Sequence, residues 1–412
     1  MYIERNITSD ILEALQSSPV ILINGARQTG KSTLVQHLAK QHGFQYVTLD
    51  NYSVMDAVKQ DPVGYLNAFK QPLIVDEVQR IPQIFQAIKQ IVDEDRRPGR
   101  FLLTGSANVF MLPKLSESLA GRLEIHTLWP FSCDELHQKK AVFVDSAFSG
   151  QISVNSMKII SLGDLFENLV KGGYPEIQKQ KSLRRRRAWF SAYITTILQR
   201  EIQEISRIEG IHEIPRLLSL LASRSGSLLV LSSLSRDAGL VLMTMKRYLA
   251  LLEATFLVTR LPAWFRNIGK RLIKAPKIYL NDTGLLSYLL GIDQIQVDLD
   301  RKILGQLLEN FVMQELSKQI TWSETQPQLY YFRTKAGKEI DFVMENRAGK
   351  IVAIEVKASA TVNSRDFAAL NELKQSLPPE SFVSGIVLYT GSEIVPFGAN
   401  LFAIPVNALW QL

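Results

Sequence analysis

The residues with the most specific chemistry in this sequence lie at positions 25–32, which read GARQTGKS. Their spacing matches the phosphate-binding pattern G-x-x-x-x-G-K-[ST], and a short apolar strand precedes it while a helical run follows. The glycines let backbone N–H groups turn towards phosphate oxygens, Lys31 supplies positive charge, and Ser32 supplies a hydroxyl for Mg²⁺. The residues expected to bind ATP are therefore Gly25, Ala26, Arg27, Gln28, Thr29, Gly30, Lys31, Ser32 and Thr33.

Two acidic residues, Asp76 and Glu77, end the run PLIV at positions 72–75. An apolar run of this kind is typical of a buried strand that delivers its carboxylates to the carboxyl-terminal edge of a sheet. We expect Asp76 to hold the Mg²⁺ that accompanies ATP, and Glu77 to polarise the attacking water as a general base. The alternative is a strand end whose acids meet only solvent, and the upstream Lys31 favours the catalytic interpretation.

Small polar residues also follow a third apolar strand, in the segment RFLLTGSAN at positions 100–108. A polar residue at this strand tip can sense the γ-phosphate or position water, and we expect Ser106 or Asn108 to do so.

Arg122 follows a tight turn and has two interpretations. It is either an arginine finger that reaches the ATP of a neighbouring subunit in a homo-oligomer, or an ordinary surface arginine.

A second group of charged residues, Glu309, Asp341, Glu355 and Lys357, occupies the last third of the chain. Glu355 and Lys357 stand two apart in the run KIVAIEVKAS, so they share one face of a strand. The three acids are expected to bind Mg²⁺ or Mn²⁺, while Lys357 orients or deprotonates an attacking water. Asp341, Glu355 and Lys357 would then catalyse phosphodiester hydrolysis. The alternative is polar faces of half-exposed strands, although an acid inside an apolar run needs a partner or a metal.

The elements that position the first group alternate between strand and helix patterns. Apolar strands are expected at 20–24, 46–49, 72–76, 100–104 and 123–128. This alternation predicts a parallel α/β sheet of the RecA-like class, with the P-loop ATPase core over residues 1–135. Residues 136–210 have mostly helical patterns and are expected to form a helical lid that follows this sheet.

Residues 211–298 are predicted to form a winged helix domain. Helices are expected at 217–221, 232–239 and 243–253, followed by wing strands at 256–261 and 277–280. If the third helix reads a DNA groove, Thr244, Lys246 and Arg247 would face it; further cations in the wing that could lie along phosphates are Arg266, Lys270, Arg271 and Lys274. The alternative is a winged helix that only packs or oligomerises.

Residues 299–412 are predicted to form a separate α/β domain around the second charged group. The expected elements are a helix at 302–320, strands at 329–334, 338–345 and 350–359, a helix at 364–377 and a strand at 384–390. This α-β-β-β-α-β order places Glu309 on the helix, and Asp341 and Glu355 on neighbouring strands.

The composition agrees with a protein of about two to four domains, since 412 residues exceed what one core usually organises. No apolar stretch of about eighteen residues is present, so we expect no membrane span. The single cysteine, Cys133, excludes an intramolecular disulfide and any cysteine-based zinc cluster. These features favour a reducing, cytoplasmic setting, and the net charge of +7 is compatible with a polyanionic partner such as DNA.

Taken together, these motifs resemble a large prokaryotic family of AAA-type ATPases that join an N-terminal P-loop domain to a conserved C-terminal domain of unknown function. The segments that carry the resemblance are GARQTGKST, LIVDEVQ, LTGSAN, SLAGRL, GGYPE, LNDTGLLSYLLG, GQLLENFV, EIDFV and IEVKAS. The C-terminal part is similar to the PD-(D/E)XK nuclease superfamily. That resemblance places Asp341, Glu355 and Lys357 on the core motif and Glu309 on its helical acid, although Asp341 follows isoleucine rather than proline.

Three functions are compatible with this organisation. The first is a DNA-directed ATPase with a metal-dependent nuclease domain. The second is a nucleotide-controlled switch whose nuclease-like domain is inactive and only holds DNA or protein. The third is a motor that remodels proteins. Metal-dependent nicking of DNA would distinguish the first function from the other two.

Overall fold

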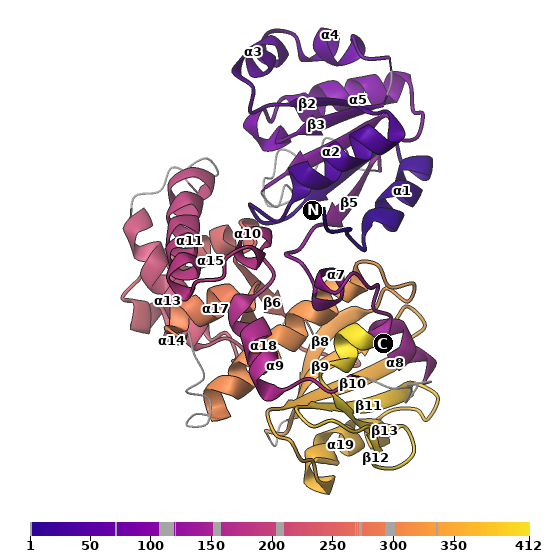
Figure 1. Ribbon diagram of the computed structural model, residues 1–412, viewed down its shortest axis with the longest axis vertical. Helices are drawn as coiled ribbons and strands as arrows, with labels where there is room; N and C mark the ends of the chain where they lie inside the picture. The colour runs from indigo at the N-terminus through magenta and orange to yellow at the C-terminus, as the bar shows by residue number, and fades with distance from the viewer. Residues whose placement is uncertain are drawn as a thin grey trace.

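The computed structural model contains three bodies (Figure 1). A sheet with its helices carries the N-terminus, a mostly helical body follows in the middle of the chain, and a second sheet carries the C-terminus. The residues that the structure describes are 2–70, 72–106, 119, 121–150, 158–202, 210–267, 269, 271, 274–292, 301–334 and 337–412. Two residues named above, Asn108 and Lys270, lie outside these ranges. Among the described residues, no helix is long and apolar enough to cross a membrane.

The first body is a five-stranded parallel sheet with the order β2-β3-β4-β1-β5. Its strands are β1 (Val20–Asn24), β2 (Gln45–Thr48), β3 (Leu73–Asp76), β4 (Phe101–Gly105) and β5 (Leu123–Thr127). The inner strands β1, β3 and β4 are buried along their whole length, which is why they are continuous apolar runs in the sequence. The parallel α/β sheet predicted for a P-loop ATPase is confirmed.

Helices cover both faces of this sheet. On one face, α1 (Thr8–Ser17) and α2 (Lys31–His42) share an apolar core with alternate residues of β1. On the other face, α3 (Tyr52–Gln60), α4 (Pro62–Asn67) and α5 (Ile84–Glu94) pack against the intervening residues. The alternation follows from strand geometry, since successive side chains point to opposite faces.

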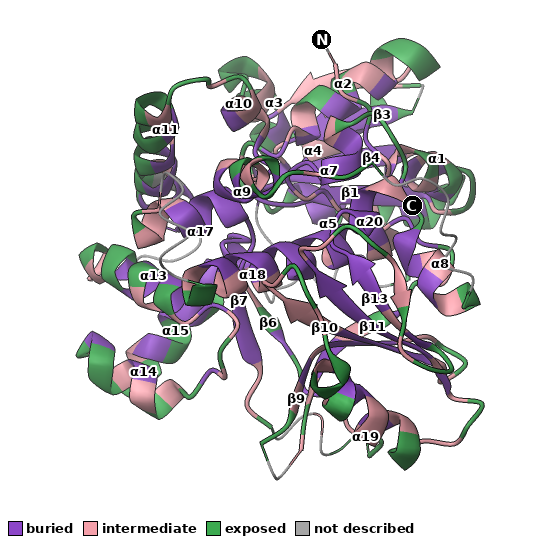
Figure 2. Cartoon of the chain, turned by 60° about the horizontal axis from the view of Figure 1, so that its bottom comes forward, coloured by how far each residue is buried: buried purple, intermediate pink, exposed green. Residues whose placement is uncertain are grey.

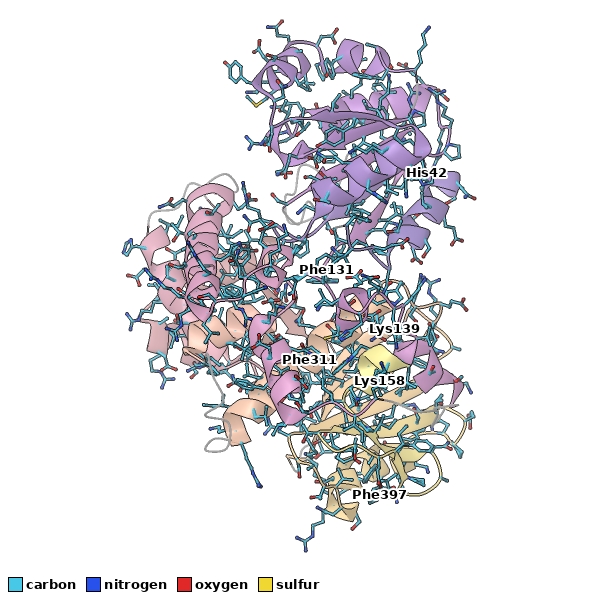
Figure 3. The ribbon with its side chains drawn as sticks, viewed as in Figure 1. His42, Phe131, Lys139, Lys158, Phe311 and Phe397 are labelled. Carbon is cyan, nitrogen blue, oxygen red and sulfur yellow. The ribbon has the colours of Figure 1, made fainter. Side chains whose placement is uncertain are left out.

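The segment that leaves the first body does not cover it. Phe131 lies where the three bodies meet (Figure 3), and its backbone N–H donates to Gly173 O at 2.8 Å. Two short helices follow, α7 (Cys133–Leu136) and α8 (Phe143–Ser149). The apolar face of α8 packs on the C-terminal sheet, and Ser384 Oγ donates to Ala147 O at 3.0 Å. Residues 136–210 were expected to form a lid on the first sheet. The first part of this range, which contains α8, instead covers the C-terminal sheet, because its apolar residues are buried against that sheet.

The helical body begins with α9 (Leu162–Lys171), α10 (Pro175–Gln178) and α11 (Leu183–Thr196), and α11 continues into a π-helical segment, Ile197–Ile202. Next come α13 (Ile214–Ser223), α14 (Leu231–Ala238) and α15 (Leu242–Ala254). The antiparallel pair β6 (Val258–Leu261) and β7 (Lys277–Leu280) precedes α17 (Thr283–Leu290). From α13 to β7 this is the order of elements expected for residues 211–298, whereas α17 was not expected. Gly239 ends α14 with a positive φ of 69°.

The C-terminal body is a six-stranded mixed sheet with the order β12-β13-β11-β10-β9-β8. Its elements are α18 (Arg301–Ile320), β8 (Gln328–Arg333), β9 (Glu339–Glu345), β10 (Ile351–Lys357), α19 (Ala368–Ser376), β11 (Phe382–Tyr389), β12 (Val395–Pro396), β13 (Leu401–Pro405) and α20 (Ala408–Gln411). The α-β-β-β-α-β order was expected from the sequence, whereas β12, β13 and α20 were not. Strands β10 and β11 are parallel, which the connecting α19 permits.

The second and third bodies share one apolar core. It runs from α8 and α9 through α13, α15 and α17 to the inner face of the C-terminal sheet. Figure 2 shows α17 buried along most of its length, as expected for a helix that is apolar all round. The first body has its own cores on the two faces of its sheet. The molecule therefore divides into an N-terminal sheet and a larger unit that combines the helical body with the C-terminal sheet.

A matched pair of glycines tests this shared core. In α17, a Cβ on Gly284 would lie 2.5 Å from Lys171 O and 2.9 Å from Phe190 Cζ, whereas a Cβ on Gly305 in α18 would meet nothing within 4 Å. We expect Gly284→Ala to destabilise the protein by about 1–3 kcal/mol through overpacking. Gly305→Ala should stabilise it by about 0.5–1 kcal/mol by reducing the freedom of the unfolded chain. Thermal unfolding midpoints that move in the same direction in both variants would contradict this packing.

Candidate functional site

The loop between β1 and α2 has the geometry of a phosphate cradle. Gly25 has φ 144°, and a Cβ there would lie 2.3 Å from Leu128 O, so the loop can pass this point only with glycine. Gly30 has φ 97° and precedes the first turn of α2, whose N-terminal N–H groups favour an anion. Arg5 Nη1 supports the loop from outside by donating to Thr29 O at 2.8 Å.

Lys31 is buried inside this loop. Its Nζ donates to the carbonyl oxygens of Gly25 at 2.9 Å and Ala26 at 2.8 Å. Burial lowers the pKa of Lys31 to about 8, and the charges of Glu77, Glu201 and Asp76 only partly oppose this effect. The ammonium group is therefore held by neutral carbonyl oxygens rather than by an ion pair, which suits a lysine that has to bind phosphate.

Asp76 and Ser32 meet as expected for a Mg²⁺ site. Ser32 Oγ donates to Asp76 Oδ1 at 3.1 Å, and Tyr46 OH donates to Asp76 Oδ2 at 2.8 Å. The hydroxyl of Thr104, on β4, donates to the same carboxylate. Mg²⁺ prefers oxygen ligands, and a hydroxyl lies here beside a buried carboxylate next to the phosphate-binding loop. Ser32 and Asp76 are therefore the residues that would hold Mg²⁺.

Glu77 follows Asp76 with a positive φ of 62°, and its carboxylate accepts from Gln79 Nε2. Burial raises the pKa of Glu77, while Lys31 and a hydrogen bond from Gln79 oppose the rise. Gln79 Nε2 also donates to Ser106 Oγ at 2.9 Å, so Glu77 and the tip of β4 are joined through one amide. A carboxylate with a raised pKa at this position is suited to act as a general base.

Glu201 is a site residue that the sequence analysis did not assign. It lies in the π-helical segment of the helical body and is buried against the P-loop. Glu201 Oε1 pairs with Arg27 Nη1 at 2.5 Å, and Ser106 Oγ donates to Glu201 Oε2 at 2.6 Å. Because the contacts join residues 95 or more positions apart, no local pattern could reveal them. A π-helical turn, which often marks functional sites, is the structural sign of this position.

Arg122 lies away from these residues. It precedes β5, and β5 runs parallel to β1, so Arg122 is at the edge of the sheet opposite the P-loop. Its guanidinium pairs with Asp93. Arg122 does not contribute to the nucleotide site of its own chain, and a role as an arginine finger would require a neighbouring subunit.

The charged residues of the last third of the chain meet where β7 lies against the C-terminal sheet. Glu309 comes from α18, Asp341 from β9 and Glu355 from β10. Lys277, the first residue of β7, is buried among the acids, with Nζ 2.9 Å from Glu309 Oε1 and 3.4 Å from Asp341 Oδ1. Glu339 Oε1 pairs with the same ammonium group at 2.5 Å. The structure therefore brings the predicted acids together, but around a lysine that was expected only to form a wing strand.

Two further contacts of this cluster are made by residues of β10. Lys357 Nζ donates to Glu355 Oε1 at 2.6 Å, and Asp341 Oδ2 accepts from Val356 N at 2.9 Å. Burial and the charge of Asp341 raise the pKa of Glu309 to about 7 and that of Glu355 to about 8. Burial lowers the pKa of Lys277, but the acids around it outweigh this effect and raise the pKa above its ordinary value.

The cluster does not fit the expected Mg²⁺ or Mn²⁺ site. Lys277 Nζ lies at the position where the carboxylates of Glu309 and Asp341 converge, and it already supplies the positive charge that they need. Over the described ranges of the chain, no group of three or more His, Cys, Asp or Glu side chains is arranged to hold a metal ion. The structure thus places a lysine from another part of the chain among Glu309, Asp341 and Glu355, the acids that were expected to bind a metal.

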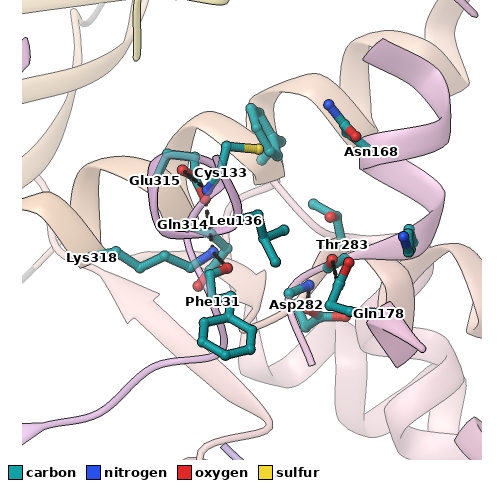
Figure 4. Close-up of a pocket in the computed structure, with 14 residues that line it drawn as sticks. Phe131, Cys133, Leu136, Asn168, Gln178, Asp282, Thr283, Gln314, Glu315 and Lys318 are labelled. Atoms are coloured by element: carbon teal, nitrogen blue, oxygen red, sulfur yellow. Dashed lines mark hydrogen bonds and ion pairs between the residues drawn. The ribbon is translucent and has the colours of Figure 1, made fainter. Parts of the chain in front are cut away.

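A small cavity between the linker, the helical body and α18 offers no alternative site. It is lined by Phe131 and Cys133 from the linker, and by Asp282, Glu315 and Lys318 from the larger unit (Figure 4). Its volume of about 20 Å³ is room for about one water molecule. Lys318 Nζ donates to Glu315 Oε1 at 2.7 Å and to Phe131 O at 2.9 Å, so the linker is fixed here by buried polar contacts.

Comparison with known proteins defines the class of protein to which this chain belongs. A family model described as "AAA domain" matches residues 17–137, the body that carries the P-loop, Asp76 and Glu77. The protein is thus an AAA-type P-loop ATPase, an enzyme that hydrolyses ATP. Two further models, both described as domains of unknown function (DUF8612 and DUF4143), match residues 162–296 and 304–409.

Two relatives match almost the whole length of this chain. "Uncharacterized protein Rv2008c" of Mycobacterium tuberculosis is 30% identical over 414 residues, which is 99% of this chain and 85% of the relative. "Uncharacterized protein Mb2031c" of Mycobacterium bovis matches with the same identity and coverage. The chain belongs to the same family as these two mycobacterial proteins.

The solved structures that the chain matches are more distant. The Walker-type ATPase PABY2304 of Pyrococcus abyssi is 13% identical, with a TM-score of 0.43, over 70% of this chain and 96% of that chain. The Thermotoga maritima RuvB Holliday junction branch migration motor is 17% identical, with a TM-score of 0.30, over 62% of this chain and 89% of that chain. AMPPCP-bound DnaA from Aquifex aeolicus is 14% identical, with a TM-score of 0.29, over 60% and 86%.

The lowered pKa of Lys31 predicts how nucleotide binding depends on pH. Phosphate raises this pKa in the complex, so the contribution of Lys31 is complete below pH 8 and declines as the pH rises above 8. We expect ATP affinity to be level from about pH 7 to 7.5 and to fall about tenfold between about pH 8.5 and 9.5. Equilibrium titration with a fluorescent ATP analogue measures this change. Lys31→Arg is the control, because its guanidinium stays charged and its affinity should not fall. An equal decline in both proteins would contradict the assignment.

Proposed function

We propose that this ATPase is a nucleotide-controlled switch that holds DNA through its helical body. The observation that carries the proposal is the contact of Glu201 with Arg27 and Ser106. Arg27 belongs to the P-loop and Ser106 to the strand tip that faces the γ-phosphate in our assignment of the site. A carboxylate from the helical body thus binds two groups that are suited to bind the terminal phosphate of ATP.

Competition between Glu201 and the γ-phosphate would link ATP to the rest of the molecule. Tyr193 OH donates to Arg27 O at 3.3 Å, and the hydroxyls of Tyr193 and Tyr174 lie 2.8 Å apart in the core of the helical body. Trp189 stacks on Tyr193 with ring centroids 5.0 Å apart. Any shift of Arg27 or Glu201 on ATP binding would therefore act on packed aromatic residues rather than on a solvent-exposed loop.

The surface of the helical body supplies charge suitable for DNA. Arg184 and Arg185 are exposed on α11, and Lys246 and Arg247 are exposed on α15, the helix expected to read a groove. Arg271 is different, because its guanidinium pairs with Glu345 and lies over the ring of Tyr330. The net charge of +7 adds long-range attraction to a polyanion. DNA cleavage is not part of this proposal, since Lys277 occupies the cation position of the carboxylate cluster.

One observation favours a second candidate, a protein partner in place of DNA. Val241 and Met243, at the start of α15, are each 74% exposed, and the neighbouring Leu242 is 42% exposed. A helix that reads a DNA groove usually presents polar side chains at its N-terminal end, whereas grouped apolar side chains are typical of protein interfaces. A nucleotide-controlled switch that holds a protein would use the same Glu201 contact.

The test compares DNA binding in different nucleotide states. We expect salt-sensitive binding of duplex DNA that differs severalfold between a non-hydrolysable ATP analogue and ADP, and Lys246→Glu with Arg247→Glu should weaken it. Glu201→Gln should reduce the difference between nucleotides, because the uncharged amide no longer pairs with Arg27. Exposed Glu380 provides the control variant Glu380→Gln, which should behave as wild type.

Fluorescence anisotropy at several salt concentrations provides the measurement. If the protein retains no DNA in any nucleotide state, the choice of DNA is wrong. In that case Val241→Asp and Met243→Asp test whether the exposed apolar residues bind a protein instead. If DNA binds equally in all nucleotide states, the proposed switch is wrong even though DNA is a ligand.

A further inference from the structure

We propose that Lys277 is the resident cation of the carboxylate cluster, so that the C-terminal sheet holds these acids together without a metal ion. The cluster consists of Glu309, Glu339, Asp341 and Glu355. This inference goes beyond the proposed function and does not depend on it, since it concerns only how the cluster is neutralised.

The geometry around Nζ is that of an ammonium group whose donors are all used. The three acids Glu309, Glu339 and Asp341 contribute one oxygen each, at 2.9, 2.5 and 3.4 Å. An ammonium group has three N–H donors and no acceptor, so three carboxylate oxygens satisfy it. The acids thus surround the ammonium group at ion-pair distances.

The backbone fixes Lys277 in this position. Its strand pairs with β6 on one side, where Lys277 is opposite Leu261, and Lys277 forms a bridge with Leu228 on the other. Leu229 N donates to Pro276 O at 2.7 Å, immediately before the strand. Lys277 itself is 1% exposed. The ammonium group is therefore shielded from solvent within the cluster.

The acids are also committed to partners on the protein. Tyr279, two residues further along the same strand, donates from its hydroxyl to Glu309 Oε1 at 2.7 Å. Asp341 uses its other oxygen to accept from Val356 N, and Glu355 pairs with Lys357. Among the described residues, Glu355 Oε2 is a buried oxygen of the cluster with no hydrogen-bond partner. If Lys277 were removed, this oxygen would be available with those of Glu309 and Asp341 for a divalent cation.

Replacing Lys277 should therefore create a metal site where none exists. We expect Lys277→Met to bind one Mn²⁺ per chain, detected by loss of the free Mn²⁺ signal in electron paramagnetic resonance, and to unfold at a higher temperature when Mn²⁺ is present. Adding Glu355→Gln should abolish both effects. Lys318→Met is the matched control: Lys318 is also buried and paired, but with the single acid Glu315, so its loss should create no Mn²⁺ site. All proteins are measured as full chains without nucleotide.

Two results would overturn the proposal. One is a folded Lys277→Met variant that binds no more Mn²⁺ than wild type. The other needs no change at Lys277: if wild type binds Mn²⁺ and Glu355→Gln or Glu309→Gln removes that binding, the cluster is a metal site despite the lysine. This second measurement decides the question even if Lys277→Met does not fold.

Discussion

The nucleotide site depends on one constraint, the parallel arrangement of the first sheet. Parallel strands end at a common edge, so residues that follow β1, β3 and β4 in the chain meet there. This is why Lys31, Asp76 and Ser106 lie in one site although the sequence separates them by dozens of residues. The same constraint places Arg122, which precedes β5, at the far edge. If one of these strands were antiparallel, the residues that follow it would lie at the opposite end of the sheet.

Two buried lysines show how their partners decide what a cation can do. Lys31 lies against neutral carbonyl oxygens of the P-loop, so burial lowers its pKa to about 8 and the charge remains available to phosphate. Lys277 touches carboxylates from α18 and β9, so its pKa is raised and its charge is neutralised within the protein. Burial alone would have lowered the pKa of both lysines. Lys31 can therefore bind the phosphate of a ligand, whereas Lys277 occupies the position at which a bound cation would lie.

The first body meets the larger unit through an ion pair and hydrogen bonds, whereas the helical body and the C-terminal sheet share an apolar core. Glu201 meets the P-loop through an ion pair and a hydrogen bond, and the linker is held by Lys318 and Glu315. By contrast, α17 and the apolar residues of α18 pack in one core with apolar side chains of both the helical body and the C-terminal sheet. Polar contacts of this kind can be exchanged for contacts with a ligand, while a continuous apolar core moves as a unit. Nucleotide-dependent change is thus expected at the boundary of the first body.

The sequence by itself determined the nucleotide-binding elements and their order, because the P-loop pattern, the buried strands and the acids at a strand end are local features. It also located α13 to α15 and most of the elements from β6 to β11 to within a few residues, but not α17, β12, β13 or α20. The tertiary structure decided which residues of those bodies meet. It packed α8 on the C-terminal sheet, brought Glu201 to the P-loop, and placed Lys277 among acids that had been expected to bind a metal. These contacts join residues far apart in the chain, and periodicity and motif spacing carry information only about near neighbours.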